Sequence, residues 1–145
     1  MGSRGMENWS SCWEVANQNP WRTPHAAAAD GRNEMISALV GHLVGDYLAQ
    51  NDWMALNKKK STLHCAVHCS IWTACVVFFA WWPLWTAIPL FVTHFVQDRT
   101  NVIAWWMDFV GQKQFRIGAC APWSIIVVDN VWHIIAIWVV SKFCG

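Results

Sequence analysis

The sequence predicts an all-α fold: a polytopic membrane protein built as an antiparallel bundle of four transmembrane helices. Two properties of the composition favour this class. Of the 145 residues, 55% are hydrophobic and only 13% are charged, whereas soluble domains carry about 25% charged residues. The third observation is that the apolar residues form four stretches separated by short polar connections. Each stretch approaches the roughly 20 residues that a helix needs to cross a bilayer.

The elements follow in order along the chain. Residues 1–34 are polar and irregular, so we predict a disordered N-terminal tail, which a start site assigned too far upstream would also explain. Residues 35–145 form the membrane domain. Its second and third spans are joined tightly by Trp82-Pro83 and are therefore expected to be antiparallel neighbours. The four spans are expected at about residues 35–54, 62–82, 84–106 and 123–140.

Basic residues orient the bundle. The second connection has no charge, whereas the first and third connections, with their edges, hold Lys58, Lys59, Lys60, Arg99, Lys113 and Arg116. The positive-inside rule then places loops one and three in the cytoplasm and both termini outside. Net charge is only +1 and the basic residues form no long stripe, which excludes a nucleic-acid-binding surface.

Every span carries two polar side chains four residues apart, a spacing that places both on one face of a helix. The pairs are His42/Asp46, His64/His68, His94/Asp98 and Asp129/His133. Because the spans alternate in direction, all four pairs fall in the cytoplasmic half of the bundle, and we expect them to converge. An aspartate near the centre of a membrane helix costs roughly 2.5 to 3.5 kcal/mol, so these acids need partners in the interior.

Imidazole and carboxylate together suit zinc and similar ions. We therefore predict a site for one or more divalent metal ions, with zinc as the first candidate. The candidate metal ligands are His42, Asp46, His64, His68, His94, Asp98, Asp129 and His133. A purely structural network of hydrogen bonds is the alternative, because polar side chains also hold membrane helices together.

The motif from His42 to Lys58, the later pairs, and Thr93 before His94 together resemble a bacterial and phage membrane family known as domain of unknown function 3307. The resemblance covers about residues 36 to 140. It implies a small polytopic protein of the bacterial inner (cytoplasmic) membrane, often phage-encoded.

A looser similarity connects the His-x3-Asp pairs with zinc-dependent phospholipase C and P1 nuclease, and with the YdjM-like membrane-bound metal-dependent hydrolases. It implies that the eight residues are metal ligands. The core of this chain contains no glutamate, so Asp46 or Asp98 would act as the catalytic base or bridge two ions.

The sequence leaves three functions open. A metal-dependent hydrolase of a lipid ester or phosphodiester would use a site near the cytoplasmic interface, with the bilayer and a lipid or phosphoester substrate as partners. A metal or proton transporter would use the same residues as an ion pathway, and four helices would then require a homo-oligomer. A non-enzymatic phage membrane protein would use the polar pairs only for structure.

Overall fold

The computed structural model describes residues 24–144, and every regular element among them is helical. The chain divides into two units, residues 1–32 and 33–145, and the second unit holds all four polar pairs. The first helix, α2 (Pro24–Leu43), begins well before Met35, where order was expected to start. Alanine is the strongest helix former, and residues 26–29 are all alanine. The rest of the expected tail, residues 1–23, lies outside the described residues.

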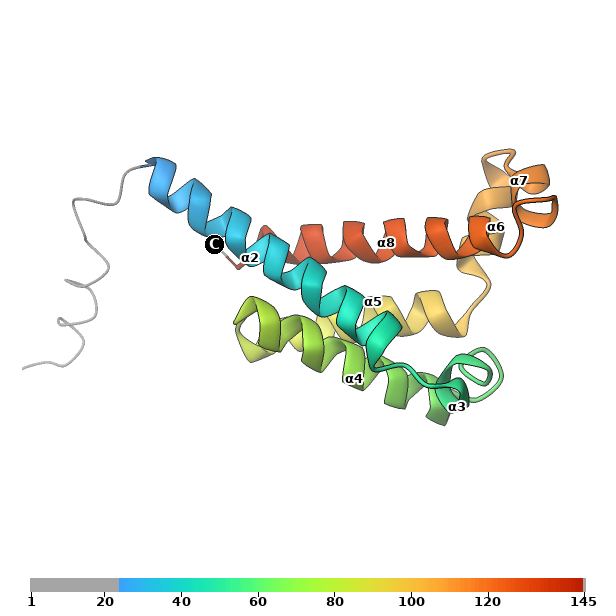
Figure 1. Cartoon of the computed structure of the whole chain (residues 1–145), viewed down its shortest axis with the longest axis horizontal. Coiled ribbons are helices and arrows are strands. Elements are labelled where there is room, and N and C mark those ends of the chain that lie inside the picture. The colour runs from blue at the N-terminus through green and yellow to red at the C-terminus, as the bar shows by residue number, and fades with distance from the viewer. Residues whose placement is uncertain (1–23, 145) are drawn as a thin grey trace, which may run out of the picture. The chain divides into compact units, whose positions relative to one another are not determined.

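Along the rest of the chain, short helices and helical turns connect the three longer helices α4, α5 and α8 (Figure 1). The π-helical turn η1 follows α2 directly. Helices α4 and α5 pack against each other, and α8 packs against α5. The short helix α3 lies at the same end of this unit as α6 and α7. In order, the elements are η1 (Val44–Leu48), α3 (Asp52–Ala55), α4 (Thr62–Ala80), the 3-10 turn η2 (Leu84–Thr86), α5 (Ala87–Arg99), α6 (Val102–Phe109), α7 (Lys113–Ile117) and α8 (Trp123–Ser141).

Two of the four expected spans are single helices. Within residues 24–144, α4 and α8 are long and apolar enough to cross a membrane. The first expected span is interrupted after η1, where the Asn51 side chain accepts a hydrogen bond from the Met54 N–H at 3.1 Å and starts α3. The third is divided at Thr100, whose backbone is extended and whose hydroxyl accepts from the Val102 N–H at 3.3 Å. Polar side chains thus form local caps where continuous helix was predicted.

Two glycines bring the first helix into close contact with α4. A Cβ atom added to Gly41 would lie 2.7 Å from the carbonyl oxygen of Cys75, and one added to Gly45 would lie 2.8 Å from the Trp72 ring. Small residues four apart permit such an approach between helix backbones. Each glycine precedes a polar residue of the first predicted pair, so the contact positions that pair beside α4.

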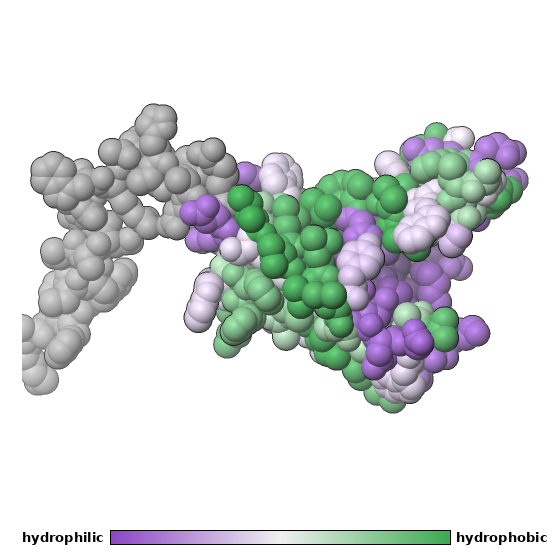
Figure 2. Space-filling model, in the orientation of Figure 1, coloured by the Kyte–Doolittle hydropathy of each residue, from purple (hydrophilic) through white to green (hydrophobic). Residues whose placement is uncertain are grey.

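The apolar core and the polar cluster occupy different levels of the unit. The core is built from Ala38, Trp72, Val76, Ala80, Trp82, Leu90, Ile137 and Val140. The polar residues of α4 and α5 lie nearer the end that holds α3, because His68 comes early in α4 and Asp98 late in α5. The surface follows the same division in Figure 2, where apolar residues cover the helices and hydrophilic residues gather toward the α3 end.

Candidate metal centre

The polar cluster is centred on three buried side chains from two helices. His68 extends from α4, and His94 and Asp98 extend from α5. The two Nε2 atoms lie 3.0 Å apart. The Oδ2 atom of Asp98 is 3.1 Å from His68 Nε2 and 3.2 Å from His94 Nε2. Each of the three residues is at most 2% exposed, so three ligand atoms meet in a nearly equilateral triangle shielded from solvent.

Asp46 approaches the same two imidazoles from η1, the turn that directly follows α2. Its Oδ1 atom lies 3.3 Å from His68 Nε2 and 3.6 Å from His94 Nε2. The residue sits in η1, where the π-helical turn closes with the Ala49 N–H donating to the Val44 carbonyl at 2.9 Å. Single π-turns frequently occur at functional sites. Asp46 Oδ1 is buried and has no hydrogen-bond partner among the described residues, which leaves its lone pairs available to a ligand.

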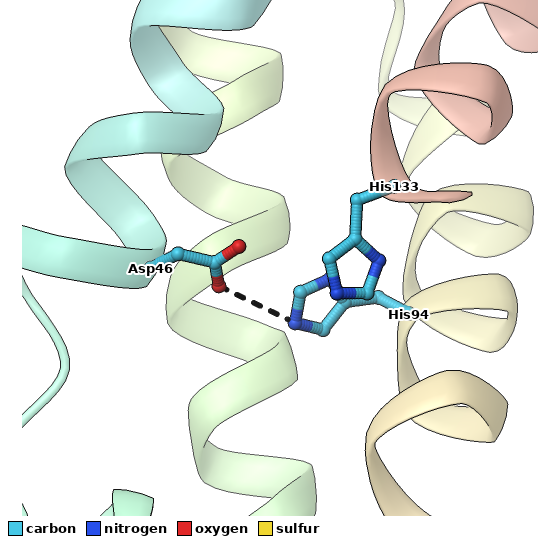
Figure 3. Close-up of side chains that lie close together, drawn as sticks. All are labelled: Asp46, His94 and His133. Atoms are coloured by element: carbon cyan, nitrogen blue, oxygen red, sulfur yellow. Dashed lines mark ion pairs between the residues drawn. The ribbon is translucent and has the colours of Figure 1, made fainter. Parts of the chain in front are cut away.

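Helix α8 completes the cluster with His133 and Asp129. The His133 ring stacks on His94 at a centroid distance of 4.1 Å, and Trp72 stacks on His94 at 4.0 Å. These two contacts fix the orientation of the His94 ring. Figure 3 shows Asp46, His94 and His133 pointing toward one another from three separate segments. His133 Nε2 also lies 3.4 Å from Asp129 Oδ2.

Three overlapping groups of side chains could each hold a metal ion, because their ligand atoms all lie within 4.8 Å of one another. One group contains Asp46, His94 and His133. Another contains His68, His94 and Asp98, and a third contains Asp98, Asp129 and His133. The cluster therefore includes both residues predicted as catalytic, Asp46 and Asp98.

His42 lies in the cluster, but its ring is committed to hydrogen bonds. Trp72 can only donate, and its Nε1–H donates to His42 Nδ1 at 3.0 Å. The amide nitrogen of Asn130 donates to Tyr47 and to Ile126, so its oxygen accepts from His42 Nε2 at 3.0 Å. With both nitrogens engaged, His42 supports the neighbouring Asp46 and does not belong to any of the three groups.

His64 is the predicted ligand that lies apart from the cluster. Its ring packs on Trp53 of α3, with centroids 4.0 Å apart. The four-residue spacing does place His64 and His68 on one face of α4. One helical turn, however, carries His64 about 5 to 6 Å along the axis, beyond the level of Asp46 and His94. The structure thus brings seven of the eight predicted ligands together and separates the eighth.

Lys58 also belongs to the site, although the pattern of paired metal ligands in the sequence did not predict it. Its Nζ atom donates to both carboxylate oxygens of Asp98, at 3.0 and 2.9 Å. The loop is fixed in place, since Lys59 donates to the carbonyl oxygens of Asp98 and Thr100 and Arg99 donates to the Lys59 carbonyl. Burial by itself would lower the pKa of Lys58, but the charge of Asp98 outweighs burial and raises that pKa above 10.5. A lysine in a basic loop gives no signal of such a contact in the sequence.

A cavity of about 250 Å³ that is lined mostly by polar and charged residues, here called the polar cavity, reaches the cluster. It is lined by residues of η1, of the loop before α4, and of α8, including Asp46, Lys58 and Asp129. A ligand in this cavity would therefore touch the edge of the candidate metal centre.

Comparison with known proteins identifies the family. The family model described as "Protein of unknown function (DUF3307)" matches residues 35–145. The chain belongs to this family. The match confirms the resemblance found in the sequence, and it begins at Met35, where the membrane domain was expected to start.

No curated protein and no solved structure matches the chain. The looser likeness to the YdjM-like hydrolases is accordingly not supported. Because a family of unknown function supplies no activity, the geometry of the cluster is the basis for a functional proposal.

Proposed function

We propose that the protein is an integral membrane protein with a buried centre for a divalent metal ion, zinc being the first candidate. The observation that carries this proposal is the triangle formed by His68 Nε2, His94 Nε2 and Asp98 Oδ2, with sides of 3.0, 3.1 and 3.2 Å. Zinc takes nitrogen and oxygen ligands at about 2.0 to 2.2 Å in a tetrahedron, which sets its ligands about 3.3 Å apart. Asp46 Oδ1 offers a further ligand atom on the same two histidines.

The charges of the cluster support a cation. The cluster contains three carboxylates, those of Asp46, Asp98 and Asp129, and among the described residues Lys58 is the ammonium group paired with one of them, Asp98. With neutral imidazoles the cluster carries a net charge of −2, and buried charge is costly unless it is paired. One divalent ion would neutralise it.

The contact between His42 and Asp46 also supports a bound cation. His42 Nδ1 accepts a hydrogen bond from Trp72, yet it lies 3.1 Å from Asp46 Oδ2. Two acceptor atoms at this distance repel each other, and a positive ion held by Asp46 would offset that repulsion.

The surface supports a bilayer location. Only 22% of the apolar stretch of α8 is buried, whereas the core helix of a soluble protein would be mostly buried. Its exposed side chains include Val127, Val131, Ile135 and Trp138. Apolar surface on this scale marks contact with a membrane or a partner. We propose that the chain crosses the membrane as a four-segment helical bundle, with the basic α3 end on the cytoplasmic side.

A second proposal is that the centre serves hydrolysis of an ester or phosphodiester. The cavity favours it, because Asp46, Asp129 and Lys58 line a space that a substrate could enter. A bound metal ion supplies Lewis acidity and a nucleophilic water at neutral pH. In this proposal Asp98 would hold the ion, with its carboxylate oriented by the hydrogen bonds from Lys58, and Asp46 would be the base for a proton of water.

Transport of metal ions or protons is less favoured. An ion pathway needs polar groups along the whole bundle. Beyond the cluster, however, α4 and α5 present the apolar core residues Val76, Ala80 and Leu90.

Metal analysis tests the main proposal. Full-length protein purified in detergent and dialysed against zinc should retain at least about one zinc per chain, since structural sites bind zinc tightly. His94→Ala should lose most of that metal, and His64→Ala, the matched histidine outside the cluster, should keep it. Folded protein that retains no zinc or other divalent ion would overturn the proposal and favour a structural polar network.

A further inference from the structure

We propose that the polar cavity beside the metal centre binds the phosphate group of a phosphate ester, with Lys58, Tyr47 and Gln50 as hydrogen-bond donors. This inference rests on the proposed metal centre and names the substrate class for it. The juxtaposition that carries it is a cavity of about 250 Å³ whose wall includes both the candidate metal ligands Asp46 and Asp129 and these three donors.

Lys58 is held in a position to bind an anion. Two of its three N–H bonds point to the carboxylate of Asp98, which leaves one N–H bond for a ligand in the cavity that Lys58 lines. Its loop is fixed to the end of α5 by the hydrogen bonds of Lys59 and Arg99. A fixed ammonium group loses little conformational entropy when it binds a phosphate, and charge-assisted hydrogen bonds are the stronger kind.

Tyr47 and Gln50 supply neutral donors from η1 and the residues that follow it. The Tyr47 hydroxyl accepts a hydrogen bond from the Asn130 amide at 2.6 Å, so its own O–H remains free to donate. The Oε1 atom of Gln50 is buried with no hydrogen-bond partner in the part of the chain that the structure describes. Gln50 also lines the cavity, and its amide nitrogen carries two N–H bonds that would serve as donors there.

The charges make phosphate binding depend on the metal. Without a metal ion, Asp46 and Asp129 outweigh the single charge of Lys58, and the cavity repels an anion. A divalent ion on the cluster cancels this excess of negative charge and also offers a direct contact to a phosphate oxygen. The metal-free protein should consequently bind phosphate weakly or not at all.

The size and position of the cavity limit the ligand. A volume of about 250 Å³ is below the roughly 300 to 1,000 Å³ of pockets that enclose drug-sized ligands, so it suits a phosphate group with few further atoms. The wall includes Ile126 of α8 as well as the η1 residues, and Val127 beside it is exposed on the apolar surface. A phosphate that carries acyl chains could thus place its tails along α8.

The test measures binding of two probes to zinc-loaded full-length protein in detergent by isothermal titration calorimetry. Inorganic phosphate reports on the shared chemistry, and dioctanoyl phosphatidic acid adds the acyl chains. Both should bind to the zinc-loaded protein and not to the metal-free protein. Binding of the lipid at least about tenfold tighter than phosphate would assign the source as a lipid headgroup, and equal affinities would assign a soluble phosphate ester.

Matched variants locate the site. Lys58→Met should weaken phosphate binding at least about tenfold, and Tyr47→Phe about two- to tenfold, as expected for a charged and a neutral hydrogen bond. Lys60→Met removes the same charge from the same loop and should have no effect. Tyr47 is 53% exposed, so its variant should fold even if the lysine variant does not.

The outcomes separate this inference from the metal proposal. Protein that holds zinc but binds neither probe would overturn the phosphate site and leave the metal centre intact. Equal binding with and without zinc, or unchanged affinity in both Tyr47→Phe and Lys58→Met, would also overturn the phosphate site. Protein that holds no metal would overturn both.

Discussion

Replacing Gly41 with alanine should both destabilise the protein and weaken its metal centre. The added Cβ would lie 2.7 Å from the Cys75 carbonyl oxygen and 2.8 Å from the Val76 Cα. Both are backbone atoms of α4, so no side-chain rotation can relieve the contact. An ordinary contact begins at 3.4 Å, and the first helix must therefore move away from α4 by about 0.7 Å at this point.

The energetic cost follows from two opposing effects. Overpacking of a well-packed interface costs typically about 1 to 3 kcal/mol, whereas alanine gains about 1 kcal/mol over glycine in helix propensity. The free energy of unfolding should therefore fall by up to about 2 kcal/mol. The same movement would lengthen the 3.3 Å separation between Asp46 Oδ1 and His68 Nε2, so zinc affinity should fall about tenfold or more.

Thermal unfolding in detergent and zinc titration measure the two effects. Val40→Ala, on an exposed part of the same helix, is the control for removal of apolar contacts without close approach. It should leave zinc affinity unchanged. A Gly41→Ala protein that is as stable as the wild type and binds zinc equally well would refute this prediction, because the first helix would then not depend on its close approach to α4.

Three further predictions concern stability. Zinc at about 100 times its Kd should raise the free energy of unfolding by about 2.7 kcal/mol, measured as a chelator-sensitive shift in Tm; no shift would contradict a metal centre. In the metal-free protein, Lys58→Met should cost about 3 to 5 kcal/mol, because it leaves the buried Asp98 carboxylate without its partner. Because the pKa of Lys58 is raised in the folded protein, the stabilisation from its ion pair is complete below pH 10.5 and is lost as the pH rises through the folded-state pKa. The Lys58→Met protein should not show this loss of stability at alkaline pH when unfolding is measured as a function of pH. Trp81→Gly should stabilise the protein by about 1 kcal/mol. Trp81 ends α4 with a φ of 55°, a left-handed conformation that costs a non-glycine residue about 1 to 2 kcal/mol. An unchanged midpoint of denaturant unfolding would contradict this prediction.

The convergence of the polar pairs could be predicted from the sequence because it depends on helical periodicity and alternating direction. His94 and Asp98 project from one face of α5, and Asp46 meets them from the first helix. Both properties follow from residue spacing alone. The family resemblance was also readable from the sequence, since its first motif is contiguous.

The depth of each residue within the bundle could not be predicted in the same way. His64 lies on the same face of α4 as His68, but one helical turn closer to α3, where its ring packs on Trp53. The division of the third span depends on hydrogen bonds of Thr100. The length of an apolar stretch does not predict such local caps. The signal for the close approach of the first helix was present as Gly41 and Gly45, four residues apart, but hydropathy does not detect it.

The crowding of ligand atoms at the centre of the cluster supports the proposed metal ion over a purely structural network of hydrogen bonds. A single proton between His68 Nε2 and His94 Nε2 satisfies their 3.0 Å contact. That proton is then not available for a hydrogen bond from the same Nε2 atom to Asp98 Oδ2, which lies 3.1 Å from His68 Nε2 and 3.2 Å from His94 Nε2. A neutral imidazole has one N–H group, and Nδ1 of both rings is buried without a partner among residues 24–144, so few hydrogens serve several short contacts. One cation would accept lone pairs from both nitrogens and from Asp98 Oδ2 at once, and the proposed metal ion would therefore account for the short distances between these atoms.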